Sequence, residues 1–201
     1  MTSPATPTPL EDRLRRARIV PVVRTGDPGE AQAIVERLLA AGLNVIELTT
    51  TIPGWPEAVA AVRAAAPEAC VGVGTILSEA QAREAVRARP DFCVSPCLVP
   101  AARGVLATAG IPFVEGGLTP TEVLDAASRG IAKLFPAHVG GPRYLRSLLA
   151  VAPGARIVPT GGIPLAEVGA WLAAGAVAVG VGADLTAPGD VGARVREALT
   201  A

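Results

Sequence analysis

The chain has 201 residues, enough for one domain with a substantial core. Half of the residues are hydrophobic, only 3% are aromatic, and 18 basic residues balance 18 acidic ones. This composition excludes the basic surface and stacking side chains of nucleic-acid-binding proteins. No apolar run reaches membrane-spanning length, and the first residues lack the pattern of a signal peptide. We therefore expect a cytoplasmic protein with neither a nucleic-acid partner nor a membrane partner.

Three cysteines, Cys70, Cys93 and Cys97, form an odd-numbered set, and the last two have the wrong spacing for a CxxC redox or zinc pair. We expect reduced thiols that pack as small hydrophobic side chains. The single histidine, His138, argues against a histidine-rich metal site. The sequence therefore gives no indication of a metal or a cofactor.

The predicted elements begin after a polar, proline-rich segment, residues 1–9, which we expect to be a disordered tail. From residue 10 onward, short apolar runs alternate with amphipathic helical stretches. The predicted strands are Arg18–Val23, Asn44–Thr49, Cys70–Gly74, Phe92–Ser95, Pro112–Glu115, Ala132–Phe135, Arg156–Pro159 and Ala176–Val181. Their almost continuous apolarity is typical of parallel strands that are covered on both faces.

Helix starts are well marked between these strands. The segments Asp27-Pro-Gly-Glu30 and Thr119-Pro-Thr-Glu122 combine a capping residue, a first-turn proline and a glutamate. A third capping box is predicted at Ser78-Glu-Ala-Gln81. Eight strand–helix units predict a single α/β domain over residues 10–201, a (β/α)8 TIM barrel with a short N-terminal helix. A doubly wound open sheet is the alternative.

Two charged residues interrupt the apolar strands. Lys133 lies in the sixth predicted strand and Glu47 in the second, and burying either charge is costly unless it is paired or neutralised. In a barrel these strands face each other, and alternate strands fill the same interior layer. A lysine that has lost its proton can form a Schiff base with a carbonyl compound, while a nearby carboxylate can move protons. The alternatives are a Lys133 whose ammonium reaches solvent, or a purely structural ion pair.

Glycine-rich turns follow the seventh and eighth predicted strands. They contain Thr160, Gly161 and Gly162 in the first turn, and Gly182 and Ala183 in the second. In TIM barrels this corner commonly binds phosphate through backbone N–H groups. Ordinary turn glycines are the alternative.

Polar residues end other strands at the same face. Arg24 closes the first strand and can pair with a carboxylate or a phosphate, although an ordinary surface arginine is equally compatible with the sequence. Thr75 follows the third strand and Ser95-Pro96 the fourth. Either hydroxyl can bind a substrate carboxylate or cap the next helix.

In these stretches the chain resembles the pyruvate-dependent class I aldolases of the 2-keto-3-deoxy-6-phosphogluconate (KDPG) aldolase family. The motifs that carry the resemblance are Val45-Ile-Glu-Leu-Thr49, Val71-Gly-Val-Gly-Thr75, Val94-Ser-Pro96, Lys133-Leu-Phe-Pro136 with Gly141-Pro142, Val158-Pro-Thr-Gly-Gly162 and Val179-Gly-Val-Gly182. They occur in the order and spacing of the family from about residue 10 to the C-terminus.

The resemblance implies a homotrimeric barrel that uses no metal. By similarity, Lys133 is the Schiff-base lysine, and Glu47 is the acid–base residue that works through a water molecule. The residues implied in substrate binding are Arg24, Thr75, Pro96, Thr160, Gly161, Gly162, Gly182 and Ala183. The implied reaction is the reversible cleavage of a 2-keto-3-deoxy-6-phospho sugar acid to pyruvate and glyceraldehyde 3-phosphate.

Four positions depart from the family pattern. Ala183 replaces a serine of many members, Thr51 an arginine of some, and His138 an expected acid. The missing serine hydroxyl removes a hydrogen bond worth about 1 kcal/mol. Glu115 replaces an apolar residue or proline, and a carboxylate near the rim is expected to repel a phosphorylated substrate.

Several functions therefore stay open beside the leading one. Two are cleavage of the galactonate epimer of the substrate and cleavage of 4-hydroxy-2-oxoglutarate. The others are a phosphate-binding barrel isomerase and a non-catalytic trimeric scaffold or sugar-acid binder on the same fold.

Overall fold

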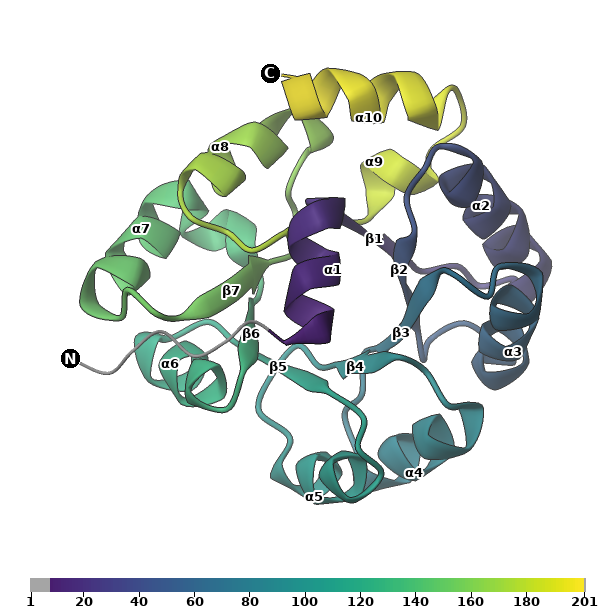
Figure 1. Ribbon diagram of the computed structural model, residues 1–201, viewed down its shortest axis with the longest axis horizontal. Coiled ribbons are helices and arrows are strands. Elements are labelled where there is room, and N and C mark those ends of the chain that lie inside the picture. The colour runs from purple at the N-terminus through teal and green to yellow at the C-terminus, as the bar shows by residue number, and fades with distance from the viewer. Residues whose placement is uncertain (1–7, 201) are drawn as a thin grey trace.

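The computed structural model describes residues 8–200, and within them the predicted TIM barrel is confirmed. Parallel strands form an inner sheet that helices surround (Figure 1). The strands are β1 Ile19–Val23, β2 Val45–Thr49, β3 Cys70–Gly74, β4 Phe92–Val94, β5 Phe113–Gly117, β6 Ile131–Leu134, β7 Arg156–Pro159 and β8 Val179–Val181. The largest difference from the sequence prediction is at β8, which begins at Val179 rather than at Ala176.

The strands pair side by side in the order β7-β6-β5-β4-β3-β2-β1-β8. β7 and β8 are joined by a parallel bridge between Thr160 and Gly180, so the barrel is nearly closed. The alternative of a doubly wound open sheet is therefore wrong.

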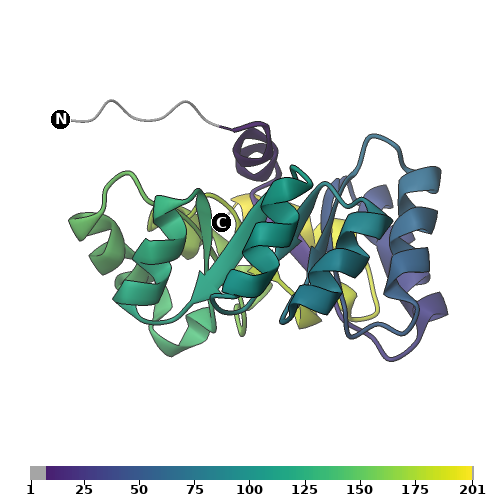
Figure 2. The same ribbon diagram turned by 90° about the horizontal axis from the view of Figure 1, so that it is seen from below.

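Helices surround the outside of the barrel, except for the first one, which precedes β1 and lies over one end of the barrel (Figure 2). They are α1 Pro9–Ala17, α2 Pro28–Ala40, α3 Trp55–Ala65, α4 Glu79–Ala88, α5 Pro100–Thr108, α6 Pro120–Ser128, α7 Gly141–Val151, α8 Val168–Ala173, α9 Ala183–Thr186 and α10 Val191–Thr200, with 3-10 turns η1 Ala137–Val139 and η2 Leu165–Glu167. Over residues 8–200, no helix combines the length and the apolar character needed to cross a membrane.

The predicted helix caps differ in one detail. Thr119 and Glu122 form the complete, reciprocal capping box at the start of α6. Ser78 accepts the N–H of Gln81, as predicted, but the Gln81 carboxamide accepts the N–H of Leu77. The helix start is thus in the predicted place, although the return bond of the box goes to the preceding residue.

Two clusters of apolar side chains make up the core. The larger cluster lies between the sheet and the surrounding helices. The smaller one fills the barrel where the strands begin, and it includes Val20, Val45, Cys70, Phe92, Val114, Ile131 and Val158. Helix α1 covers this end of the barrel and adds Leu10 and Leu14 to the same cluster (Figure 2).

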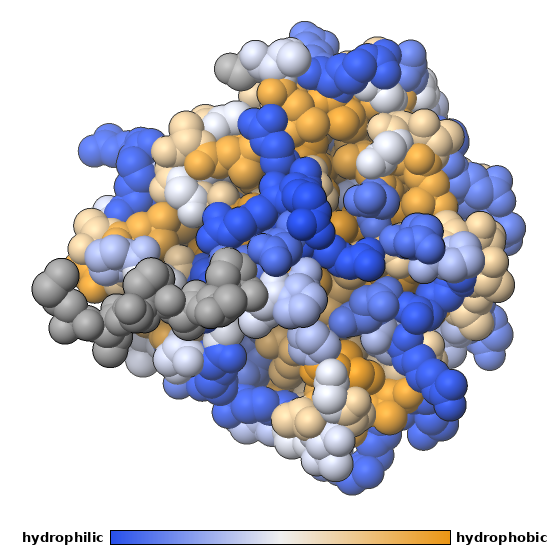
Figure 3. Space-filling view, viewed as in Figure 1, coloured by the Kyte–Doolittle hydropathy of each residue, from blue (hydrophilic) through white to orange (hydrophobic). Residues whose placement is uncertain are grey.

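Helix α1 is amphipathic, so its polar side chains face outward over the middle of the barrel end (Figure 3). Within α1, Glu11 is buried and pairs with Arg15 of the same helix and with Arg156 of β7. Of the tail predicted over residues 1–9, residues 1–7 lie outside the described residues. Thr8 caps α1 and Pro9 begins it. With α1 in place, the strand-start end of the barrel is covered.

Candidate active site

Lys133 and Glu47 meet inside the barrel, as predicted. The Lys133 side chain is 7% exposed and the Glu47 side chain 5%, so the alternative of a lysine whose ammonium reaches solvent is wrong. Nζ of Lys133 lies 3.7 Å from Oε1 of Glu47, which allows charge attraction but is longer than a hydrogen bond. The ammonium also lies 5.4 Å from the centre of the Phe135 ring, within the range of a cation–π contact.

Glu47 has room in the barrel because the neighbouring strand β3 carries glycines. Gly72 is the register partner of Glu47, and a Cβ at Gly74 would overlap the Glu47 carboxylate. Oε1 of Glu47 is buried and accepts no hydrogen bond from residues 8–200. Because buried polar atoms are nearly always bonded, this oxygen is available for a bound molecule rather than committed to the fold.

Threonine hydroxyls hold Arg24 at the carboxyl ends of the first three strands. Its Nη1 donates to Oγ1 of Thr51 and its Nη2 to Oγ1 of Thr75, each at 3.1 Å. Thr51 is in turn 2.8 Å from the hydroxyl of Thr49. Thr51, one of the departures noted in the sequence, therefore supports a guanidinium supplied by another strand.

Thr75 has a backbone φ of +65°, a conformation that β-branched residues rarely adopt. Its carbonyl accepts the hydroxyl of Thr50 at 2.8 Å, which helps to hold this conformation. Strained residues of this kind gather at functional sites, where the surrounding structure maintains them. The sequence predicted Thr75 as a site residue, whereas only the structure reveals its strained backbone.

A cavity of about 700 Å³ opens at the carboxyl ends of β1, β6, β7 and β8. It brings together most of the predicted site residues, namely Arg24, Lys133, Thr160, Gly161, Gly162, Gly182 and Ala183. Gly161 and Gly162 have φ values of +96° and +67°, and Cβ atoms there would meet Phe135 and His138. The glycine backbones thus form one wall of the cavity.

The predicted site residues Glu47, Thr75 and Pro96 do not line this cavity, and neither does His138. Pro96 packs against the backbone of Gly116, the register partner of Lys133. His138 is exposed, and its Nδ1 is 3.3 Å from the carbonyl oxygen of Gly161. His138 therefore adjoins the glycine turn from outside.

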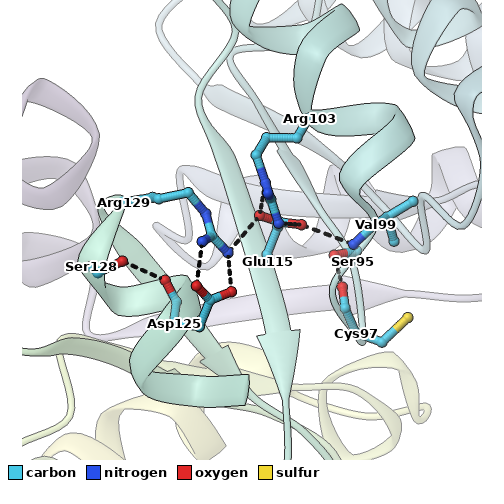
Figure 4. A network of polar contacts seen from close by, with 8 residues as sticks. All are labelled: Ser95, Cys97, Val99, Arg103, Glu115, Asp125, Ser128 and Arg129. Carbon is cyan, nitrogen blue, oxygen red and sulfur yellow. Dashed lines mark hydrogen bonds and ion pairs between the residues drawn. The ribbon is translucent and has the colours of Figure 1, made fainter. Parts of the chain in front are cut away.

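The expectation that Glu115 lies near the rim and repels substrate is wrong. Its buried carboxylate lies outside the barrel wall, bonded to Arg103 of α5 and to Arg129 at the end of α6 (Figure 4). The reason is the alternation of side chains along a strand. Gly116 and Val114 face the interior, so Glu115 between them faces the helices.

Several cavity-lining residues were not predicted as site residues from the sequence, among them Phe135, Asp184 and Thr186. Phe135 directly follows the Lys133 strand and covers its ammonium. Thr186 donates its hydroxyl to the carbonyl of Ala183, so a hydroxyl lies one helical turn from the missing serine. Asp184 accepts the backbone N–H of Leu165 with a carboxylate oxygen at 2.8 Å. Of these residues, only Thr186 could have been identified from the sequence, through its spacing of three residues from Ala183.

Neither the acidic residues nor the cysteines form a metal site in the part of the chain described here. No group of three His, Cys, Asp or Glu side chains in it is arranged to hold an ion. Cys70 and Cys93 are buried and free, and Cys97 is exposed and free. Burial raises the pKa of the Cys70 thiol to about 11 and that of Cys93 to about 12.

The chain matches a known family and several known proteins. Residues 10–194 match the family model described as KDPG and KHG aldolase. The chain is 32% identical to a probable 2-dehydro-3-deoxy-6-phosphogalactonate aldolase of Rhizobium meliloti, over 89% of this chain and 86% of that one. It is also 32% identical to a 2-dehydro-3-deoxy-phosphogluconate aldolase of Treponema pallidum, over 81% of this chain and 79% of that one.

A solved structure shows the same similarity in three dimensions. The KDPG aldolase of Zymomonas mobilis with 3-phosphoglycerate superposes with a TM-score of 0.81 and 29% identity. The match covers 94% of each chain. The similarity therefore extends through the whole barrel.

Proposed function

Because the chain belongs to the KDPG and KHG aldolase family, we propose that it is a Schiff-base-forming aldolase, with Lys133 as the nucleophile. Its substrate in this proposal is a 2-keto-3-deoxy-6-phospho sugar acid, which it cleaves reversibly to pyruvate and glyceraldehyde 3-phosphate. The observation that carries the proposal is the buried Lys133 ammonium, 3.7 Å from a carboxylate oxygen and facing an open cavity.

The chemistry begins at the lysine nitrogen. After Nζ has lost its proton, it attacks the C2 keto carbon, and loss of water leaves a protonated imine. Removal of the C4 hydroxyl proton breaks the C3–C4 bond, and the electron pair moves to C3 to form an enamine. The aldehyde departs, C3 takes up a proton, and water hydrolyses the imine to release pyruvate and free Lys133.

Glu47 is the group that moves these protons in the proposal. Its carboxylate is beside Nζ, its Oε1 is not bonded to the protein over residues 8–200, and Gly74 leaves space around it. A positioned acid–base group contributes about 10²- to 10⁴-fold to a rate.

The groups in and beside the cavity suit the two anionic groups of the substrate. Arg24, Thr75 and Thr51 gather hydrogen-bond donors and a positive charge for the carboxylate. In the turns after β7 and β8, Gly161, Gly162 and Gly182 line the cavity and allow the backbone to approach a phosphate closely. The substrate-binding assignments of Pro96, Thr160 and Ala183 belong to the same proposal.

The size of the cavity is compatible with a phosphorylated, six-carbon substrate. A volume of about 700 Å³ lies within the usual range for small-molecule sites, about 300–1,000 Å³. The similar Zymomonas mobilis structure contains 3-phosphoglycerate, a three-carbon phosphate comparable in length to glyceraldehyde 3-phosphate. We also propose a cytoplasmic homotrimer, which light scattering of the purified protein tests separately.

Cleavage of the galactonate epimer is the second candidate, since a similar protein carries the name of that activity. The 4-hydroxy-2-oxoglutarate activity is a third, and it needs no phosphate. Initial rates with the three substrates, compared as kcat/KM, separate these candidates. The highest value identifies the substrate.

The decisive experiment is borohydride trapping with pyruvate, read by intact mass and peptide mapping. Lys133 is the only lysine in the sequence, so an adduct on a lysine has one possible position. We expect the mass of one reduced pyruvate, on the peptide that contains Lys133. A folded protein that forms no adduct, beside a reactive control aldolase, would overturn the Schiff-base mechanism.

A further inference from the structure

We propose that Glu115 is a positioning residue for this reaction, acting from outside the barrel. It holds the loop between β4 and α5, residues 95–99, against the strand that neighbours Lys133. The inference depends on the proposed function, because its consequence is measured on the lysine chemistry.

The buried carboxylate of Glu115 uses both of its oxygens in a network whose arginine side chains are partly exposed (Figure 4). Oε2 accepts Nε of Arg103 at 2.7 Å and Nη2 of Arg129 at 3.1 Å. Oε1 accepts Nη2 of Arg103 at 3.1 Å and the backbone N–H of Val99 at 2.8 Å. The carboxylate therefore joins a strand, two helices and a loop at one point.

The bond to Val99 resembles the return bond of a capping box, in which a carboxylate accepts the N–H of the N-cap residue. Val99 is the N-cap of α5, and valine has no side-chain oxygen that can accept a backbone N–H. Glu115 instead accepts the N–H of Val99 itself, where the loop enters the helix. The end of the loop is thus fixed by β5 rather than by its own sequence.

The start of the same loop is fixed on the opposite face of β5. Ser95 donates its N–H to Val114 and its hydroxyl to the carbonyl of Cys97. The carbonyl oxygens of Ser95 and Pro96 lie 2.6 Å from the place where a Cβ of Gly116 would be. The loop therefore passes over the interior face of β5 and returns to Glu115 on the exterior face.

The interior contact is adjacent to the nucleophile. Gly116 and Lys133 are register partners in β5 and β6, and register partners in a sheet point to the same face about 5 Å apart. The Ser95 and Pro96 carbonyls thus lie beside the root of the Lys133 side chain. A loop that loosens there changes the wall against which the imine is oriented.

Glu115 is the central member of this network because both arginines pair with its carboxylate. Arg129 has a second partner in Asp125, with bonds of 2.8 and 2.9 Å, whereas Arg103 has only Glu115 among the described residues. A glutamine at position 115 keeps an acceptor for Val99 but turns N–H groups toward the Arg103 guanidinium. We therefore expect Glu115→Gln to release the loop and α5 together.

The test compares Glu115→Gln with Asp91→Asn. Asp91 is a matched control because it also bonds a backbone N–H, that of Val71, and an arginine, Arg63. It precedes β4, at the end of the barrel opposite to the cavity. Both variants lose a carboxylate that joins a strand to its surroundings, but only one of them holds the loop beside Lys133.

Three measurements are made on wild type and both variants: melting temperature, kcat and KM for cleavage, and deuterium exchange of the peptide containing Val99. We expect Glu115→Gln to lower kcat by up to about 100-fold, the cost of misplacing reacting groups by about 1 Å. KM should change little, and the Val99 peptide should exchange faster. Asp91→Asn should lower the melting temperature and leave kcat unchanged.

Equal kcat values in the two variants, at a similar loss of melting temperature, would overturn the positioning role. If Glu115→Gln does not fold, Arg103→Lys replaces it, since lysine keeps the charge but cannot bond both carboxylate oxygens in parallel. Unchanged kcat in that variant would equally overturn the role. Wild-type protein without a pyruvate adduct would instead refute the proposed function, and this inference with it.

Discussion

Oε1 of Glu47 lies 3.7 Å from Nζ of Lys133, and yet it accepts no hydrogen bond from any residue between 8 and 200. A buried ion pair often contributes little net stability, because removing both charges from water is costly. A pair that also leaves a buried oxygen unbonded is still less favourable. The barrel keeps this arrangement beside the cavity that Lys133 lines, as the proposed reaction requires.

Replacing Lys133 separates its chemical role from its structural one. Lys133→Met should give no borohydride adduct and no cleavage, and it should destabilise the fold by about 3–5 kcal/mol because Glu47 is left buried without a partner. The double variant with Glu47→Gln should recover part of that loss. Urea unfolding checks the stabilities, and the inactive double variant must remain unlabelled. Cleavage activity in Lys133→Met would contradict the mechanism.

Replacing Glu47 alone should leave the imine step in place. Glu47→Gln keeps the shape of the side chain, so pyruvate should still be trapped on Lys133. We expect kcat to fall by about 10²- to 10⁴-fold, since proton transfer to and from the substrate is lost. Intact mass and steady-state rates measure the two effects. A variant with wild-type kcat would remove Glu47 from the reaction.

Thr75 should show opposite effects on stability and on activity. Glycine at this position relieves the strain of a positive φ but has greater freedom in the unfolded chain. We expect Thr75→Gly to leave the free energy of unfolding unchanged or to raise it by up to about 1 kcal/mol. The lost hydroxyl, which supports Arg24, should raise KM for the keto acid.

Thr75→Ser is the matched variant for this position, because it keeps the hydroxyl and removes only the methyl group. Its KM should stay close to that of wild type. If glycine and serine raise KM equally, the hydroxyl has no part in substrate binding.

The buried thiols predict how stability depends on alkaline pH. Burial raises the pKa of Cys70 to about 11 and that of Cys93 to about 12, from an ordinary value of 9.0. Both thiols stay protonated below pH 9 whether the chain is folded or not. Between about pH 9 and 11 the unfolded chain loses these protons more readily than the folded chain, so the free energy of unfolding should fall as pH rises.

Urea unfolding at pH 8, 9, 10 and 11 measures this fall. Alanine at positions 70 and 93 should make it less steep, while Cys97→Ala, which removes the exposed thiol, should not. An unchanged slope after removal of the buried thiols would assign the effect to other groups.

Much of the fold could be predicted because its signals are local. The eight apolar runs locate the strands, and the capping residue Thr119 locates a helix start within one residue. Lys133 and Glu47 were predicted to meet from the symmetry of a barrel alone. Such inferences depend on the periodicity of apolar residues, which can be read directly from the sequence.

The features that could not be predicted depend on the direction in which a side chain points and on contacts between residues that are far apart in the sequence. Glu115 was placed near the rim, because a strand end does not reveal which face a side chain takes when both faces are covered. The support of Arg24 by Thr51 requires two strands in register. The positive φ of Thr75 is not encoded by its residue type, which disfavours that conformation.

Helix α1 covers the end of the barrel where the strands begin, so substrate and products share the opening at the other end. In the proposed cleavage, the pyruvyl group is bonded to Lys133 inside the barrel while the aldehyde lies toward the opening. The aldehyde must therefore leave first and pyruvate second. Pyruvate should inhibit cleavage competitively, and the aldehyde product should inhibit it noncompetitively.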